Sequence, residues 1–110
     1  MSIEPSSHTC PVCGYQGLEQ APYANFTRLP LPDSLVPPYS QYFGEPSYDV
    51  CDCCGFEFGN DDEPGTAPPS TFQEYRQEWI AHGGRWLDPS KRPQDWTLER
   101  QLRNAWLQAD

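Results

Sequence analysis

Two short cysteine motifs constrain this chain more than any other feature. Residues 10–14 read Cys-Pro-Val-Cys-Gly, and residues 51–55 read Cys-Asp-Cys-Cys-Gly, so each contains a C-x-x-C-G unit. A two-residue gap lets both thiolates of a tight turn face one ion, and the glycine permits a positive φ. Two such units supply four soft sulfur ligands, the tetrahedral set that Zn²⁺ prefers. The sequence therefore predicts one Zn²⁺ per chain.

Four cysteines are the predicted metal ligands: Cys10, Cys13, Cys51 and Cys54. Cys53 competes with Cys54 in the second unit, but Gly55 follows Cys54 in the position that the motif requires. Cys53 is then a spectator, or a redox-active thiol beside the metal. His8 can replace a cysteine as a ligand, and soft thiolates can also hold iron.

The charge balance limits what the chain can bind. Sixteen acidic residues stand against seven basic ones among 110 residues, a formal net charge of -9, and the pI is near 4.4. Such a chain has no general affinity for phosphate backbones or for anionic lipid. We also find no apolar run long enough to cross a membrane and no secretory signal, which predicts a cytoplasmic location where disulfides are uncommon.

The length suits one domain. We expect residues 1–9 to form a flexible leader and residues 10–110 to form the domain. Within it, residues 10–65 are predicted to be zinc-ribbon-like and residues 66–110 to be helical. The fold class is therefore small α+β: a pair of cysteine knuckles with short antiparallel strands and a long insertion, followed by two helices.

The gap between Cys13 and Cys51 is 37 residues, more than the usual ~15–20. Residues 15–50 are rich in proline and aromatic residues, and disordered linkers are poor in aromatics. We expect an irregular but largely ordered loop, with short strands near residues 15–18, 47–50 and 56–58. Residues 60–65 are acidic and turn-rich, and we expect a solvated turn there.

Two helices are predicted in the C-terminal part. Residues 71–74 read Thr-Phe-Gln-Glu, a capping box that begins the first helix, and Gly83-Gly84 end it. His82 then lies at the negative end of the helix dipole. A second helix is expected over residues 96–109. The residues expected to pack these helices on the ribbon are Phe72, Tyr75, Trp79, Leu98, Leu102 and Trp106.

Residues 10–15 (CPVCGY) and 48–62 (YDVCDCCGFEFGNDD) resemble the small bacterial cysteine-rich CPCC-type proteins of the zinc-ribbon class. The helix at 71–80 and the segment from Trp86 onward are similar to the C-terminal part of those proteins. The chain departs from them at Val12, where that family often has a second cysteine. The resemblance implies a metal-binding fold and brings no activity.

The function expected from these features is a structural-zinc-binding acidic protein that acts as a protein-interaction module. Its partner would be a protein with a basic surface, contacted through the aromatic residues of 39–48. The alternatives are a thiol redox or zinc-dependent enzyme and a nucleic-acid-binding zinc ribbon. We predict no catalytic residues, because the chain lacks a Ser–His–Asp order, a G-x-S-x-G motif and a Gly-rich phosphate loop. Only Lys91 and Arg92 are adjacent cations, so we expect no nucleic-acid binding.

Overall fold

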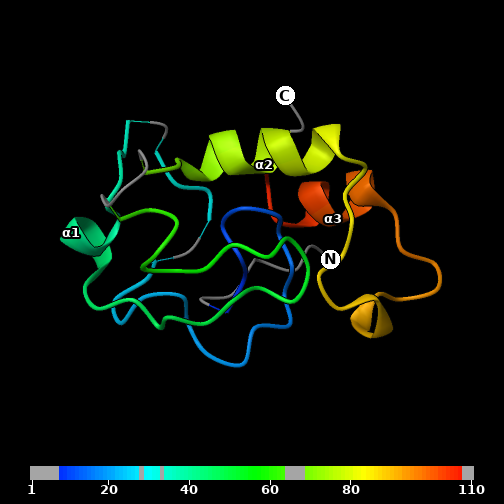
Figure 1. The fold of residues 1–110 in the computed structure, drawn as a ribbon, viewed down its shortest axis with the longest axis horizontal. Coiled ribbons are helices and arrows are strands. Elements are labelled where there is room, and N and C mark those ends of the chain that lie inside the picture. The colour runs from blue at the N-terminus through cyan, green and yellow to red at the C-terminus, as the bar shows by residue number, and fades with distance from the viewer. Residues whose placement is uncertain (1–7, 28, 33, 64–68, 108–110) are drawn as a thin grey trace.

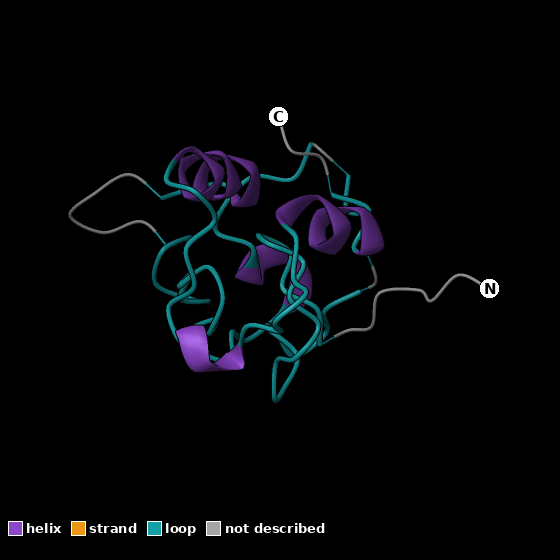
Figure 2. Cartoon of the chain, turned by 90° about the vertical axis from the view of Figure 1, so that its right-hand side faces the viewer, coloured by secondary structure: helices purple, strands orange, loops and turns teal. Residues whose placement is uncertain are grey.

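A computed structural model describes residues 8–27, 29–32, 34–63 and 69–107 (Figure 1). Over these residues the chain forms helices and loops, without a named strand (Figure 2). None of the helices in these ranges has the length and apolar character needed to span a bilayer. The elements in chain order are α1 (Ser40–Phe43), α2 (Phe72–Ala81), the 3₁₀ turn η1 (Pro89–Lys91) and α3 (Leu98–Asn104).

The ribbon strands expected from the sequence are absent from the described residues, so that part of the fold prediction is wrong. Two isolated antiparallel bridges stand in their place: Tyr23 with Pro46, and Val50 with Glu57. The second bridge cannot extend into a ladder, because the backbone has a positive φ at Tyr48 (62°) and at Gly59 (98°). A left-handed residue on either side interrupts the extended conformation that pairing requires.

Helix α2 begins and ends where the sequence predicts. Thr71 Oγ1 accepts a hydrogen bond from the Glu74 backbone N–H at 2.9 Å, and Glu74 Oε1 accepts one from the Thr71 N–H at 3.1 Å. This reciprocal capping box confirms the predicted start. Gly83 and Gly84 have φ values of 92° and 65° and turn the chain out of the helix.

Helix α3 is shorter than expected. Thr97 caps its first turn by accepting from the Arg100 N–H, and the helix ends at Asn104, with Ala105 as its C-cap. Trp106 has a φ of 59° and is 42% exposed, so the prediction that it packs in the core is wrong. Leu102 and Ala105 face the core instead. Residues 108 and 109 of the expected helix lie outside the described residues.

The insertion is irregular over its described residues, as predicted, and its aromatic side chains build much of the core. The Tyr39 ring stacks on Phe72 of α2 with centroids 3.7 Å apart, and the Tyr39 hydroxyl accepts the Phe72 N–H at 3.1 Å. The insertion therefore packs directly against the helical part. Its buried residues include Tyr23, Phe26, Leu29, Tyr39 and Phe43.

Asp62 corrects the expectation of a solvated acidic turn, because its side chain is fully buried. Its carboxylate accepts hydrogen bonds from the Tyr23 hydroxyl at 2.7 Å, the Gly59 N–H at 2.8 Å and the Tyr39 N–H at 3.2 Å. Three donors offset the cost of burying a carboxylate. Burial and the hydrogen bond to Asp62 raise the pKa of Tyr23, so this phenol stays protonated. Asp62 therefore joins the insertion to the segment after the second cysteine motif.

Trp79 and Trp106 provide a matched test of this core. Trp79 is buried and its indole N–H donates to the Arg85 carbonyl at 2.8 Å. Removing a large buried aromatic side chain costs ~3–5 kcal/mol. We expect Trp79→Ala to lower the thermal midpoint by roughly 12 °C or more, and Trp106→Ala to change it far less. Calorimetry or circular-dichroism melts measure both, and equal midpoints for the two variants would contradict this placement of α2.

Candidate metal centre

The two cysteine motifs fold into the same backbone turn. In the first knuckle (residues 10–15) the Gly14 N–H donates to the Cys10 carbonyl at 2.9 Å, and the Cys10 N–H donates to the Tyr15 carbonyl at 2.8 Å. In the second knuckle (residues 51–56) the equivalent hydrogen bonds are 2.9 and 3.0 Å long. The glycines have φ values of 87° and 83°, the left-handed conformation expected from the motif. The repeated motif therefore produces a repeated structure.

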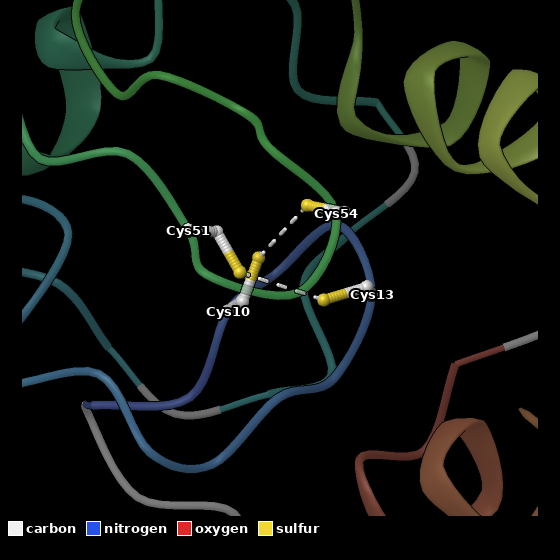
Figure 3. A group of neighbouring side chains, drawn as sticks. All are labelled: Cys10, Cys13, Cys51 and Cys54. Carbon is white, nitrogen blue, oxygen red and sulfur yellow. Dashed lines mark hydrogen bonds between the residues drawn. The ribbon is translucent and has the colours of Figure 1, made fainter. Parts of the chain in front are cut away.

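The turns bring four sulfurs from two distant parts of the chain together (Figure 3). Cys10 Sγ lies 3.8 Å from Cys54 Sγ, and Cys13 Sγ lies 3.7 Å from Cys51 Sγ. Both contacts join one knuckle to the other. All four sulfurs lie within 4.8 Å of one another, and all four residues are buried. The group could hold a metal ion.

Two of the sulfur–sulfur distances equal the edge of a tetrahedral zinc site. A Zn–S bond of about 2.3 Å sets the sulfurs of a regular tetrahedron about 3.8 Å apart. The two contacts of 3.7 and 3.8 Å match that edge. They are far longer than a disulfide bond, and all five cysteines are free.

The pKa values of the thiols show what the cluster needs in order to ionise fully. Burial raises the pKa of the Cys13 and Cys54 thiols well above their usual value and also raises that of Cys10. Hydrogen bonds from the neighbouring thiols lower the pKa of Cys51. Without a cation, most of these sulfurs keep their protons, and four thiolates form only when a positive ion compensates them.

Helix α3 packs against the first knuckle. A Cβ on Gly14 would lie 2.8 Å from the Ala105 Cβ and 3.0 Å from the Gln101 carbonyl oxygen, so only glycine allows this approach. The Gln101 Nε2 donates to the Cys13 carbonyl at 3.0 Å and to the Cys53 sulfur at 3.4 Å. Gln101 thus contacts both knuckles, a role that sequence reasoning missed because nothing local marks a contact 88 residues away.

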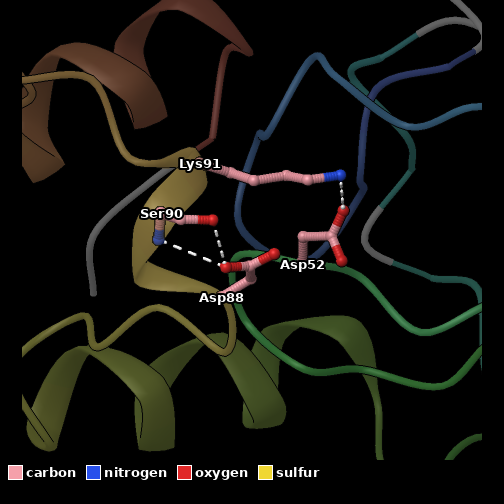
Figure 4. Close-up of polar contacts among 4 residues, drawn as sticks. All are labelled: Asp52, Asp88, Ser90 and Lys91. Atoms are coloured by element: carbon pink, nitrogen blue, oxygen red, sulfur yellow. Dashed lines mark hydrogen bonds and ion pairs between the residues drawn. The ribbon is translucent and has the colours of Figure 1, made fainter.

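The segment before α3 packs against the second knuckle. The N–H groups of Leu87 and Asp88 donate to the carbonyls of Cys53 and Asp52, both at 2.9 Å. Lys91 forms an ion pair with Asp52 at 3.0 Å, and the Asp88 carboxylate caps η1 (Figure 4). Both knuckles are therefore backed by the helical part of the chain.

The competing ligands lie outside the four-sulfur group. Cys53 is buried, and its sulfur accepts from Gln101. His8 is exposed.

On helix α2, the Tyr75 hydroxyl would lie 3.7 Å from a Cβ on Gly55, which places it beside the second knuckle. Burial and the negative charge of Cys54 raise the pKa of Tyr75 to about 12, so this hydroxyl stays protonated at neutral pH.

Comparison with known proteins adds relatives but no activity. The chain is 28% identical over 101 residues to the uncharacterized protein YozI of Bacillus subtilis (strain 168), an alignment that covers 83% of this chain and 71% of YozI. It is 29% identical over 100 residues to the uncharacterized protein YoaQ of the same organism, covering 80% and 70%. No family model and no solved structure matches the chain. The resemblance to CPCC-type proteins therefore remains a prediction.

The choice between Cys53 and Cys54 can be tested by substitution. We expect Cys54→Ser to lose tight metal binding, because it removes one sulfur of the tetrahedron. Cys53→Ser should keep one metal ion per chain, because Cys53 lies outside the group. Native mass spectrometry of both variants reports the stoichiometry. Metal retained by Cys54→Ser and lost by Cys53→Ser would reverse the assignment.

Proposed function

We propose that the chain is a zinc-stabilised binding module. One Zn²⁺ is held by Cys10, Cys13, Cys51 and Cys54. The observation that carries this proposal is the group of four buried sulfurs with inter-knuckle contacts of 3.7 and 3.8 Å. The ion would cross-link two knuckles that no sheet connects over the described residues.

The donor set favours a structural role over catalysis. A catalytic zinc ion has three protein ligands and one open position for water, whereas four thiolates close the coordination shell. The fifth thiol, Cys53, is fully buried, which argues against thiol redox turnover at that residue. We therefore favour a structural metal site over the two enzyme alternatives, a thiol redox enzyme and a zinc-dependent enzyme. The proposal treats residues 10–110 as one cytoplasmic domain, where reducing conditions keep the thiols free.

The distribution of charge supports a basic protein partner. Residues 1–63 contain ten acidic residues and one basic residue, whereas residues 64–110 contain six of each. Four thiolates and one Zn²⁺ would change the formal -9 to about -11. This field repels phosphate and attracts a basic protein surface. Tyr39 and Phe43 are buried, so Tyr42 and Tyr48, which are exposed, are the aromatic anchors that remain.

Metal removal tests the structural role. Structural zinc sites carry ~10–16 kcal/mol of apparent binding free energy, comparable to the whole stability of a small domain, ~5–15 kcal/mol. We expect a strong chelator to remove the ion and abolish the near-ultraviolet circular-dichroism signal of the aromatic core, and added Zn²⁺ to restore it. A full aromatic signal in protein shown by mass spectrometry to be metal-free would overturn the structural role.

Partner binding tests the second half of the proposal. Immobilised protein should retain a basic protein from a lysate of a Bacillus species, and recovery should fall as salt rises because charges at the rim are screened. The double variant Tyr42→Ser/Tyr48→Ser should retain less, since aromatic residues contribute much of the binding energy at interfaces. Submicromolar binding to random-sequence DNA or RNA at ~150 mM salt would instead support the nucleic-acid alternative.

A further inference from the structure

The four cysteines of the cluster are not equally buried. Cys10, Cys13 and Cys51 are fully buried, whereas Cys54 is 8% exposed. The difference is small in area, but it makes Cys54 the one residue of the four that contacts solvent. Figure 3 shows Cys54 on the side of the cluster that faces α2.

A cleft of about 600 Å³ lies between the second knuckle and α2, and Cys54 is part of its wall. Glu74, Glu78 and His82 follow one another at four-residue steps along α2, so they share one face of the helix, and all three line the cleft. The His82 Nδ1 is 2.8 Å from the Glu78 carbonyl oxygen, which holds the ring at the end of the helix. Lysine and arginine are absent from the described residues that line the cleft.

Tyr75 and Trp79 form the apolar part of the same wall. The Tyr75 ring packs edge-on against Phe56 with centroids 5.0 Å apart, so it is held beside the second knuckle. The cleft therefore combines a partly exposed cysteine, an apolar surface and two carboxylates. It admits a small neutral molecule more readily than an anion.

We propose that Cys54 is the reactive thiolate of this centre and that soft carbon electrophiles reach it through the cleft along α2. The inference rests on the proposed metal centre, because a bound cation keeps Cys54 as a thiolate, the nucleophilic form of cysteine. It gives the centre a second property beside its structural one. Chemical modification of this single residue would remove one of the four metal ligands.

Iodoacetamide is a soft carbon electrophile that would alkylate Cys54. The Cys54 sulfur uses an electron pair to form a C–S bond with the methylene carbon. The C–I bond breaks, and iodide leaves with its electron pair. No proton moves, because the sulfur is already a thiolate. The product is a neutral thioether, a much weaker ligand than a thiolate, so modification leaves three good ligands and favours release of the ion to a competing chelator.

Cys53 offers a contrast within the same knuckle. Cys53 and Cys54 are neighbours in the sequence, but Cys53 is fully buried and its sulfur accepts a hydrogen bond from Gln101. It does not line the cleft. The surroundings in the fold therefore separate the two cysteines in the same way as the C-x-x-C-G motif does, with Cys54 in the group and Cys53 outside it.

The test compares two reagents of the same size and chemistry on the metal-loaded chain: neutral iodoacetamide and anionic iodoacetate. Native mass spectrometry first establishes that one metal ion is bound. Peptide mapping then gives the order in which the five cysteines are modified, and a chromophoric chelator records metal release. Glu78→Lys changes the charge of the cleft, and Glu99→Lys is the matched control, because it makes the same change at an exposed residue of α3 that does not line the cleft.

We expect Cys54 to be modified first by both reagents, with metal release following at the same rate. Glu78→Lys should raise the ratio of the iodoacetate rate to the iodoacetamide rate at Cys54 by about two- to fivefold, and Glu99→Lys should leave it nearly unchanged. Modification of another cysteine before Cys54, or equal effects of the two variants, would overturn the proposal while the bound metal still supported the structural centre. Protein that binds no metal at the outset would overturn both.

Discussion

The arrangement depends on four sulfurs of buried residues packed within 4.8 Å of one another. Four thiolates at that spacing cannot remain charged without a cation, because desolvation and mutual repulsion both favour the protonated forms. A divalent ion removes both costs at once. The fold around the cluster consists of helices and loops over its described part, so ladder hydrogen bonds do not hold the knuckles together. Contacts between sulfurs are the most direct link between them.

A second buried group supports the insertion in a similar way. Asp62 is a fully buried carboxylate with three hydrogen-bond donors from two segments of the chain. It fixes Tyr23 and the backbone of Tyr39, and Tyr39 in turn stacks on α2. Both the sulfur cluster and Asp62 therefore use one polar centre to connect irregular segments. A chain with 13 prolines has few other means of doing so, because proline lacks the N–H that regular elements need.

The helical part of the chain covers the two knuckles differently. Helix α3 and Gln101 cover the first knuckle, and residues 87–91 cover the back of the second. Helix α2 approaches the second knuckle but leaves a cleft beside Cys54. Cysteines of the same motif thus differ in burial because of the elements that pack around them. Residues 1–63 carry the whole formal net charge of -9, whereas residues 64–110 are balanced.

Short local motifs in the sequence were enough to predict the turns of the two knuckles, the four cysteines that group together and the residue at which α2 begins. In each, the signal and its structural effect lie within a few residues: a left-handed glycine after a C-x-x-C pair, or a threonine three residues before a glutamate. Tertiary structure alone decided which acidic residue is buried, that Trp106 is exposed, that the expected strands are replaced by two bridges, and that Gln101 contacts both knuckles. These outcomes depend on which distant segments meet. Contacts between distant segments have no periodic or local signal in the sequence from which they could be predicted.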